Sequence, residues 1–279
     1  MKISVNSYSF GGAAAQTPET LADALRSAAE WGYDGFELTD GPWSSCDNAA
    51  EILKKASEEA GIPLVCYCIG ADFLRNDPET ELERVCEKQL LAGRLGVPMM
   101  RHDLSSGLPG KLSDEDFSQA LPILVEYAKK SADRAKLLGI TVLTENHGYF
   151  CQDADRVGAV IRGVGRENFR LLADVGNFMC ADEYPPESLG KVVDLVAHVH
   201  AKDFYKYDSK PEDRACFPTR SGAFLEGCVA GEGDAGVSES IKILKNKGYD
   251  GWLSLEYEGN GDRAECIKRG LASLRRLIG

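Results

Sequence analysis

Four apolar runs of this sequence end in side chains that can bind a cation. Three end in a carboxylate and one in a histidine: Glu145, Asp174, His200 and Glu256. If these residues meet inside a protein they cannot all stay charged and unpaired, because burying an unpaired charge costs too much. One divalent cation would balance them. The ligand types suit Mn²⁺, Mg²⁺, Co²⁺ or Zn²⁺ without choosing among them, and our working assignment is a single Mn²⁺ ion.

The histidine belongs to the run 196–203, which has the alternation of a strand. Successive side chains of a strand point to opposite faces, so His198, His200 and Lys202 share one face and small apolar residues the other. This pattern suits the wall of a barrel whose upper inner face belongs to a site. We interpret His198, deeper in the strand, as a core histidine, since a metal site needs a converging set of ligands.

A recurring unit must position these residues: a helix that stops at glycine, followed closely by a strand. The helix stops are Gly32, Gly61, Gly96, Gly139 and Gly248. Repeated units of this kind predict alternating strands and helices around a parallel sheet. We expect strands that start near Ile3, Gly35, Pro63, Pro98, Ile140, Arg170, Val196 and Trp252. Eight units without a break in composition predict one α/β domain over 1–279, a (β/α)8 TIM barrel.

The main competitor of the barrel is an open, doubly wound sheet that binds a dinucleotide. No Gly-x-Gly-x-x-Gly motif follows the first strand, which removes the main support for that fold. One connection, at about 203–237, is unusually long and follows the seventh strand. We predict a long loop that is a lid, a binding loop or a solvated insertion. Lys210, Arg214 and Arg220 within it could hold a phosphate group.

The composition excludes several classes of protein. The net charge of −12 argues against nonspecific binding of nucleic acid, which depends on lysine and arginine. The chain contains no run of ~18 apolar residues, so we expect no membrane span. The N-terminus enters a strand-like alternation directly and does not resemble a signal peptide. Nine scattered cysteines indicate reduced thiols in a cytoplasmic protein. A homo-oligomer is left open.

The motifs at the predicted strand ends, taken together, resemble the xylose isomerase-like superfamily. They are Glu-Asn-His-Gly at 145–148, Asp-Val-Gly-Asn at 174–177, His-Val-His-Ala-Lys-Asp at 198–203, Gly-Glu-Gly-Asp at 231–234 and Leu-Ser-Leu-Glu-Tyr-Glu at 253–258. The superfamily contains sugar isomerases and epimerases, inosose dehydratases and endonuclease IV. Endonuclease IV needs a cluster of three metals rich in histidine. This acidic chain has only four histidines, so DNA cleavage is disfavoured.

The resemblance implies that Glu145, Asp174, His200 and Glu256 hold the metal and that Glu145 and Glu256 are also the acid and base. It implies a sugar, sugar-phosphate or polyol isomerase or epimerase working through an enediolate. Two glutamates can move the proton, and the metal can stabilise the oxyanion. Lys202 could add a charge-assisted hydrogen bond to a substrate hydroxyl. The alternatives are a lyase of the inosose dehydratase type and a non-catalytic sugar-binding barrel.

Five further residues are candidates for substrate binding: Tyr8, Glu37, His102, His147 and Asn177. Glu37 resembles a position that is often acidic in the family, and either binds a sugar hydroxyl or pairs with a neighbour. His102 is either a substrate contact or a hydrogen-bonded structural histidine. His147 is placed at the pocket wall and Tyr8 at its floor. Asn177 stands where ketose 3-epimerases typically carry histidine, which argues against ketohexose 3-epimerisation.

Overall fold

A closed barrel of eight parallel strands forms the centre of the molecule in a computed structural model that describes residues 1–279. The strands are β1 (Lys2–Asn6), β2 (Gly35–Thr39), β3 (Leu64–Ile69), β4 (Met99–His102), β5 (Thr141–Glu145), β6 (Phe169–Asp174), β7 (Val196–Ala201) and β11 (Trp252–Leu255). Around the barrel their order is β1-β11-β7-β6-β5-β4-β3-β2. Each strand begins within one residue of its predicted start, and the predicted (β/α)8 barrel is confirmed.

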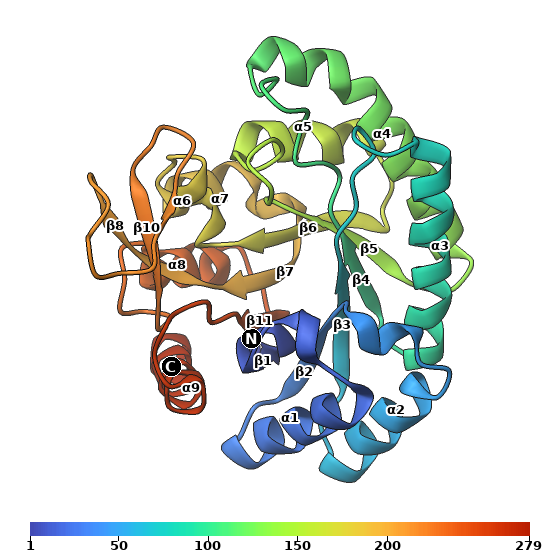
Figure 1. The fold of residues 1–279 in the computed structure, drawn as a ribbon, viewed down its shortest axis with the longest axis vertical. Coiled ribbons are helices and arrows are strands. Elements are labelled where there is room, and N and C mark those ends of the chain that lie inside the picture. Colours follow the sequence, from blue (N-terminus) through green and yellow to red (C-terminus); the bar gives the residue numbers. More distant parts are fainter.

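Helices surround the strands in a ring (Figure 1). They are α1 (Pro18–Trp31), α2 (Ala49–Ala60), α3 (Pro78–Leu95), α4 (Asp114–Lys136), α5 (Ala154–Val164), α6 (Asn177–Cys180), α7 (Pro185–Val192), α8 (Val237–Asn246) and α9 (Arg263–Ile278). Short 3-10 turns complete the chain: η1 (Ser7–Phe10), η2 (Ala13–Ala15), η3 (Pro42–Ser45) and η4 (Val193–Leu195). The side chain of Thr17 caps α1 by accepting from the Thr20 amide, and α3 ends at Gly96 with a φ of 76°.

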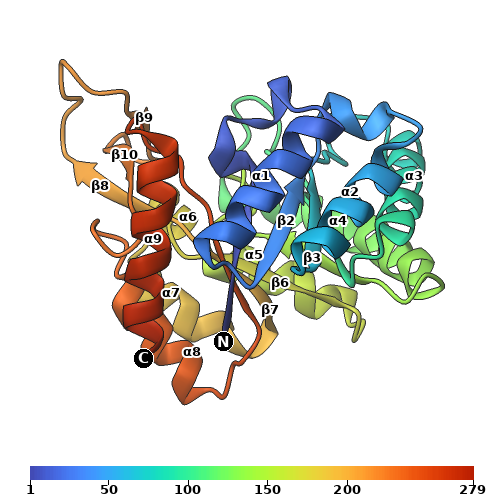
Figure 2. The same cartoon turned by 90° about the horizontal axis from the view of Figure 1, so that it is seen from below.

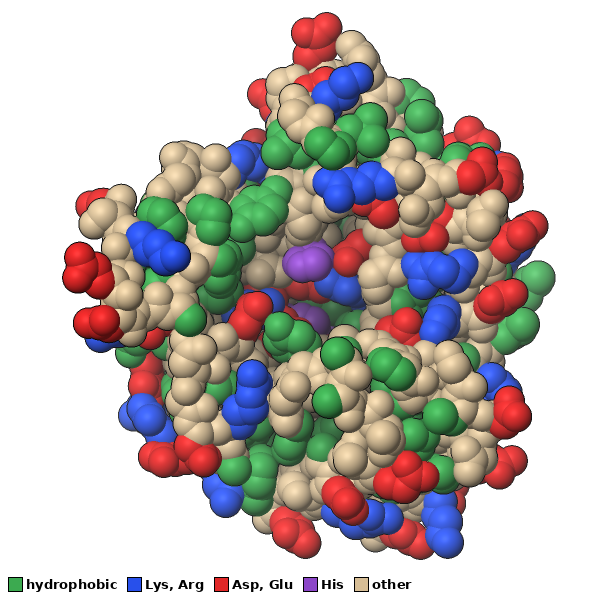
Figure 3. Space-filling model, viewed as in Figure 1, with side chains coloured by type: hydrophobic (Ala, Val, Ile, Leu, Met, Phe, Trp, Pro, Cys, Tyr) green, Lys and Arg blue, Asp and Glu red, His purple; other side chains and the backbone are tan.

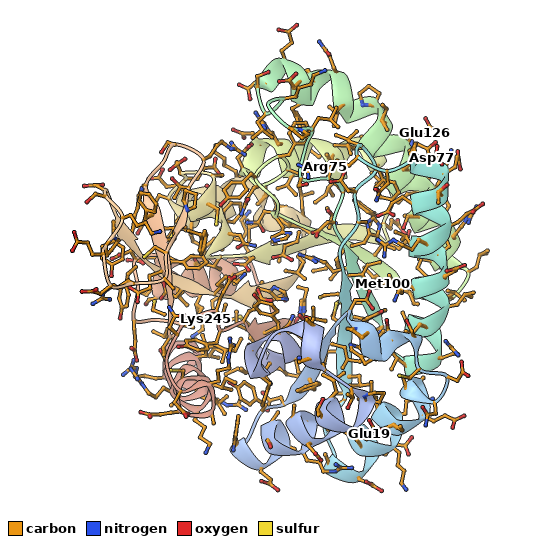
Figure 4. All side chains as sticks on the ribbon, viewed as in Figure 1. Glu19, Arg75, Asp77, Met100, Glu126 and Lys245 are labelled. Atoms are coloured by element: carbon orange, nitrogen blue, oxygen red, sulfur yellow. The ribbon has the colours of Figure 1, made fainter.

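The hydrophobic core has two parts. The larger part lies between the strands and the helices and includes Met100 of β4, which is labelled in Figure 4. The smaller part lies inside the barrel and includes Cys66, Leu143 and Leu172. Barrel interiors of this fold are packed with side chains and are not open pores. The polar residues of the candidate site therefore stand above a closed apolar floor.

The segment 203–237, which we call the insertion, carries a small sheet instead of an extended loop. Its strands β8 (Asp203–Tyr207), β9 (Phe217–Pro218) and β10 (Phe224–Cys228) pair antiparallel in the order β8-β10-β9. The insertion follows β7 as predicted. Its sheet stands at one side of the barrel, and the turn after β8 projects beyond the ring of helices (Figure 2).

One buried carboxylate joins the two ends of the insertion. Asp203 accepts hydrogen bonds from the backbone amides of Phe204 at 2.9 Å, Gly231 at 2.8 Å, Gly233 at 2.9 Å and Ala235 at 3.0 Å. A side chain at Gly233 would place its Cβ 2.5 Å from the Asp203 carboxylate, so only glycine fits there. The Gly-Glu-Gly-Asp motif thus forms a turn around Asp203.

None of the helices combines the length and the apolar character that crossing a membrane requires. All nine cysteines are free thiols.

Candidate metal centre

The four predicted ligands meet at one end of the barrel. Glu145 and Asp174 are the last residues of β5 and β6, His200 lies near the end of β7, and Glu256 directly follows β11. Asp174 and Ser254 stand opposite His200 in the neighbouring strands, which brings the inward side chains to the same level. Ligand atoms of the four residues all lie within 4.8 Å of one another. The barrel mouth is hollowed at its centre, where histidine, acidic and basic side chains are visible (Figure 3).

His200 turns one ring nitrogen toward the three carboxylates. Its Nδ1 is buried and has no hydrogen-bond partner. The nearest oxygen, Oε2 of Glu256, is 3.5 Å away, and one oxygen each of Glu145 and Asp174 lies at 3.8 Å. Burial alone would lower the pKa of His200, but the charges of Glu37 and Glu256 raise it well above its usual value. Surroundings that attract a proton so strongly also attract a divalent cation.

Asp174 supplies a second buried atom that lacks a partner. Its Oδ1 accepts from the Asn177 amide at 3.0 Å, whereas Oδ2 accepts no hydrogen bond. Lys202 Nζ lies 3.2 Å from Oδ2, a distance typical of an ion pair, but the contact is not a hydrogen bond. Burial raises the pKa of Asp174. Buried polar atoms without partners call for an explanation, and a divalent ion held by these residues would provide one. The donor set therefore fits a metal ion.

Glu37 lies beneath His200 and not at the surface of the cavity. Its Oε1 accepts from His200 Nε2 at 2.6 Å and from Asn6 Nδ2 at 2.5 Å, and its Oε2 is 2.5 Å from His198 Nε2. The side chain is fully buried. Of the two alternatives set out for Glu37, the structure shows pairing with neighbours in place of the substrate contact. A carboxylate behind a histidine orients that histidine toward a metal.

Two of the predicted histidines also stand away from the centre. His102 is fully buried and faces the helices, where Nδ1 lies 2.8 Å from the Asp103 carbonyl and Nε2 lies 2.9 Å from the Ser131 hydroxyl of α4. Of the two alternatives set out for His102, the contacts are those of a hydrogen-bonded structural histidine and not of a substrate contact. His198 contacts Glu37 and none of the three carboxylates, in keeping with its interpretation as a core histidine.

Two cations accompany the carboxylates. Lys202 Nζ lies 2.7 Å from Glu256 Oε2 and 3.4 Å from Glu258 Oε2. Arg101 contacts Glu145 and lies 3.1 Å from Asp103 Oδ1. Arg101 was not predicted from the sequence. The alternation of β4 contained the signal, because adjacent residues of a strand point to opposite faces and Arg101 and His102 cannot both point inward.

The remaining candidates line a cavity of about 330 Å³ at the mouth. Asn177 Nδ2 donates to Glu145 Oε1 at 2.8 Å, so this residue contacts a candidate ligand directly. His147 is half-exposed, and its Nδ1 lies 3.2 Å from Asp103 Oδ2. Tyr8 lines the cavity, with its hydroxyl 3.5 Å from Glu258 Oε1.

Two aromatic residues that the sequence analysis did not single out also line the cavity: Tyr149 and Phe217. Tyr149 follows β5 and has a φ of 62°, and its hydroxyl donates to the Pro218 carbonyl at 2.6 Å. Arg220 donates to the Tyr149 carbonyl and, at 3.0 Å, to Asp153 Oδ2. These bonds fasten the insertion over one side of the cavity.

Comparisons with known proteins agree with this architecture. Residues 25–277 match the family model described as a xylose isomerase-like TIM barrel. An inosose dehydratase from Clostridium botulinum is 24% identical over 255 residues, which cover 86% of this chain and 82% of that protein. L-ribulose 3-epimerase superposes with a TM-score of 0.79 at 16% identity and covers 99% of this chain and 94% of its own.

A further solved structure is a xylose isomerase-like TIM barrel protein from Mycobacterium smegmatis in complex with magnesium. It superposes with a TM-score of 0.76 at 18% identity, covering 99% of this chain and 96% of its own. At such identities the solved structures establish the fold alone. Because the family model matches nearly the whole chain, this protein belongs to the xylose isomerase-like TIM barrel family.

Proposed function

We propose that this protein is a divalent-metal-dependent isomerase or epimerase that acts on a sugar or polyol. The observation that carries the proposal is the meeting of Glu145 and Glu256 in one cluster, with carboxylate oxygens within 4.8 Å of each other. Two carboxylates arranged around one small volume can serve as base and acid for the same carbon. The L-ribulose 3-epimerase with the same fold supports this assignment.

The surroundings of both glutamates keep them ionised. Burial opposes ionisation, but Lys202 and His200 hold the pKa of Glu256 down to about 2. Arg101 and His200 likewise outweigh burial and hold the pKa of Glu145 well below its usual value. Each carboxylate can therefore act as a base and remove a proton from the carbon beside a carbonyl. The other carboxylate can act as the acid once it has taken up a proton.

Glu145, Asp174, His200 and Glu256 would hold the divalent ion, which supplies positive charge that polarises the carbonyl and stabilises the developing oxyanion. Lys202 lies 2.7 Å from Glu256 and lines the cavity, so it can donate a hydrogen bond to a substrate hydroxyl beside that glutamate. Asn177 fixes Glu145 through its amide, which keeps that carboxylate aimed at the substrate.

A metal-dependent dehydratase is the second candidate. The inosose dehydratase from Clostridium botulinum, related over 86% of this chain, favours it. Dehydration begins with the same proton abstraction and ends with loss of a neighbouring hydroxyl as water. Lys202, beside Glu256, is placed to assist a leaving hydroxyl by hydrogen bonding.

One experiment distinguishes the two candidate functions. The Mn²⁺-loaded protein is incubated in D₂O with a panel of ketohexoses, ketopentoses and inososes, and products are read by mass spectrometry and NMR. An isomerase or epimerase gives a product that gains deuterium and keeps its heavy-atom composition, whereas a dehydratase gives a product that has lost water. A protein that retains metal but exchanges no deuterium with any of these compounds is a sugar-binding barrel, and the proposal fails.

A further inference from the structure

We infer that the substrate is uncharged: a keto-sugar or keto-polyol that carries neither a phosphate nor a carboxylate group. The inference rests on the proposed function and narrows the substrate class of that site. It depends on which groups already pair with the lysine and arginine side chains and with the backbone amides near the barrel mouth.

The cavity offers no spare cation. Of all lysines and arginines, only Arg101 and Lys202 line it. Three carboxylates surround Lys202, the most distant of them, that of Glu258, at 3.4 Å. Arg101 is shared between Glu145 and Asp103. An anionic group entering the cavity would have to displace one of these pairs.

The charges at the centre leave no excess of positive charge for an anionic substrate. Glu145, Asp174, Glu256 and Glu258 bring four negative charges, while Arg101 and Lys202 bring two positive ones, and a divalent ion would add two more. Two further carboxylates lie beside this set: Asp103, which contacts Arg101 and His147, and Glu37, which contacts His198 and His200. A phosphate ester brings a further charge of about −1.5 to −2, and burying it without a partner is strongly unfavourable.

The basic residues of the insertion do not reach the cavity. Arg214 donates to Glu226 Oε2 at 2.8 Å, and Arg220 is held by Asp153 and the Tyr149 carbonyl. Lys210 is exposed and does not line the cavity. All three were predicted from the sequence as residues that could hold a phosphate, and none of them lines the cavity.

The glycine-rich turn that could cradle an anion after the seventh strand is also occupied. Barrels often bind phosphate at the loops after the seventh and eighth strands, and glycine-rich turns with convergent amides suit that purpose. In this chain the glycine-rich turn after the insertion directs its Gly231, Gly233 and Ala235 amides onto the carboxylate of Asp203. These three amides are therefore not free to bind a phosphate group.

An uncharged ring meets suitable groups in the same cavity. Tyr8, Tyr149 and Phe217 present aromatic surface, and Lys202 and Asn177 present donors. Aromatic walls with a few placed polar groups are the usual surroundings of a small uncharged ligand.

The test uses matched ligand pairs on the Mn²⁺-loaded full-length protein: D-fructose with D-fructose 6-phosphate, D-tagatose with D-tagatose 6-phosphate, and an inosose. Binding is measured by saturation-transfer NMR and calorimetry, separately from turnover. We expect the uncharged member of each pair to bind at least about tenfold more tightly. Tighter binding of a phosphate ester, or no binding of any uncharged ligand at millimolar concentration, overturns the inference.

A variant sharpens the charge argument. Glu258→Gln removes one partner of Lys202 and should reduce the discrimination against the phosphate esters several-fold. Glu19→Gln on α1, labelled in Figure 4 at the outer ring of helices, should leave the discrimination unchanged. Equal discrimination in Glu258→Gln and the native protein overturns the charge argument. If uncharged ligands bind preferentially but no deuterium is exchanged, the proposed function fails while the inference about charge stands.

Discussion

Glu145 and Glu256 are the same side chain in unlike surroundings. Glu145 is fixed on both oxygens, by the Arg101 guanidinium and by the Asn177 amide at 2.8 Å, and its side chain is 2% exposed. Glu256 is held by a single ammonium group, that of Lys202 at 2.7 Å, and its side chain is 11% exposed. An arginine fork is planar and always charged, whereas a lysine ammonium is compact and sits on a flexible stem.

From this difference we propose a division of tasks between the two sides of the barrel mouth. On the β4–β5 side, the fixed geometry suits a carboxylate that must be aimed at one carbon. On the β7–β11 side, the lysine can exchange its partner carboxylate for a substrate hydroxyl without leaving the cavity.

Removal of either carboxylate charge should nearly abolish turnover. Glu145→Gln and Glu256→Gln should each lower kcat by about 10²–10⁴, the range that general acid–base catalysis supplies. Steady-state kinetics on the substrate found in the D₂O screen measure the effect, with Glu19→Gln as the matched control on the outer surface. Full turnover in Glu145→Gln would show that the two glutamates do not act as a pair.

Removal of the two cations should have unlike consequences for stability. Arg101→Met and Lys202→Met each leave buried carboxylates unpaired, at a cost of about 3–5 kcal/mol in the metal-free protein. Added Mn²⁺ should restore Lys202→Met more completely, since an ion beside Asp174 and Glu256 replaces the lost charge. In Arg101→Met, Asp103 loses a partner that the ion does not replace and keeps only His147. Urea denaturation with and without Mn²⁺ measures the free energy of unfolding of both variants. If Mn²⁺ restores the two variants equally, the proposed division between the two sides is wrong.

The hydrogen bond from His200 to Glu37 should set the metal affinity. Glu37→Gln should weaken Mn²⁺ binding by about 10–100-fold, the usual effect of losing the carboxylate behind a metal-binding histidine. His198→Gln, which alters only the lower partner of Glu37, is the matched control and should have a smaller effect. Calorimetric titration of the metal-free proteins with Mn²⁺ measures the metal affinity without any substrate. Unchanged affinity in Glu37→Gln would assign this carboxylate a purely structural role.

The Glu256–Lys202 pair should stabilise the metal-free protein in a defined pH window. The pKa of Glu256 falls from its ordinary value of 4.5 to about 2, because Lys202 and His200 outweigh burial. A lowered folded-state pKa means that the contribution is complete above about pH 4.5 and is lost as the pH falls toward about 2. The stability difference between the native protein and Lys202→Met should therefore shrink over that window. A difference that stays constant from pH 5 to about 2 would contradict it.

The smallest effect should come from the aromatic wall. Phe217→Ala should raise KM a few-fold and leave kcat nearly unchanged, because the ring lines the cavity and packs edge-on against Phe204 but carries no acid or base. Phe217→Leu, which keeps apolar bulk, is the control. A fall in kcat as large as that of the glutamate variants would place the insertion within the reacting centre.

Local patterns predicted the strands and the four converging ligands because both depend on short-range rules. Glycine after a helix and alternation within a strand determine where a strand starts and which way its side chains point. The same alternation places Glu145, Asp174 and His200 on the inside. No more than this was needed to place the candidate centre at the barrel mouth.

The alternatives that the sequence left open, and the residues it did not indicate, depend on contacts between distant segments. Whether Glu37 meets substrate or histidine is decided by β7, which lies far along the chain. His102 is satisfied by Ser131 of α4, a residue that no local pattern connects to it. Tyr149 and Phe217 lie in connecting segments whose sequences show no helical or strand periodicity. The sheet of the insertion forms by pairing of strands across a long turn. Local sequence rules do not specify any of these contacts.

The four hydrogen bonds of Asp203 have a consequence for how such a barrel can diversify. Since one carboxylate joins the start of β8 to the turn at 231–235, the chain between them is closed on itself before it returns to α8. Lengthening a loop whose ends are already joined adds only a small entropic cost. A change in the length of this segment would therefore alter one wall of the cavity, together with the bonds that Tyr149 and Arg220 make across it, while β7, α8 and the four candidate ligands keep their places.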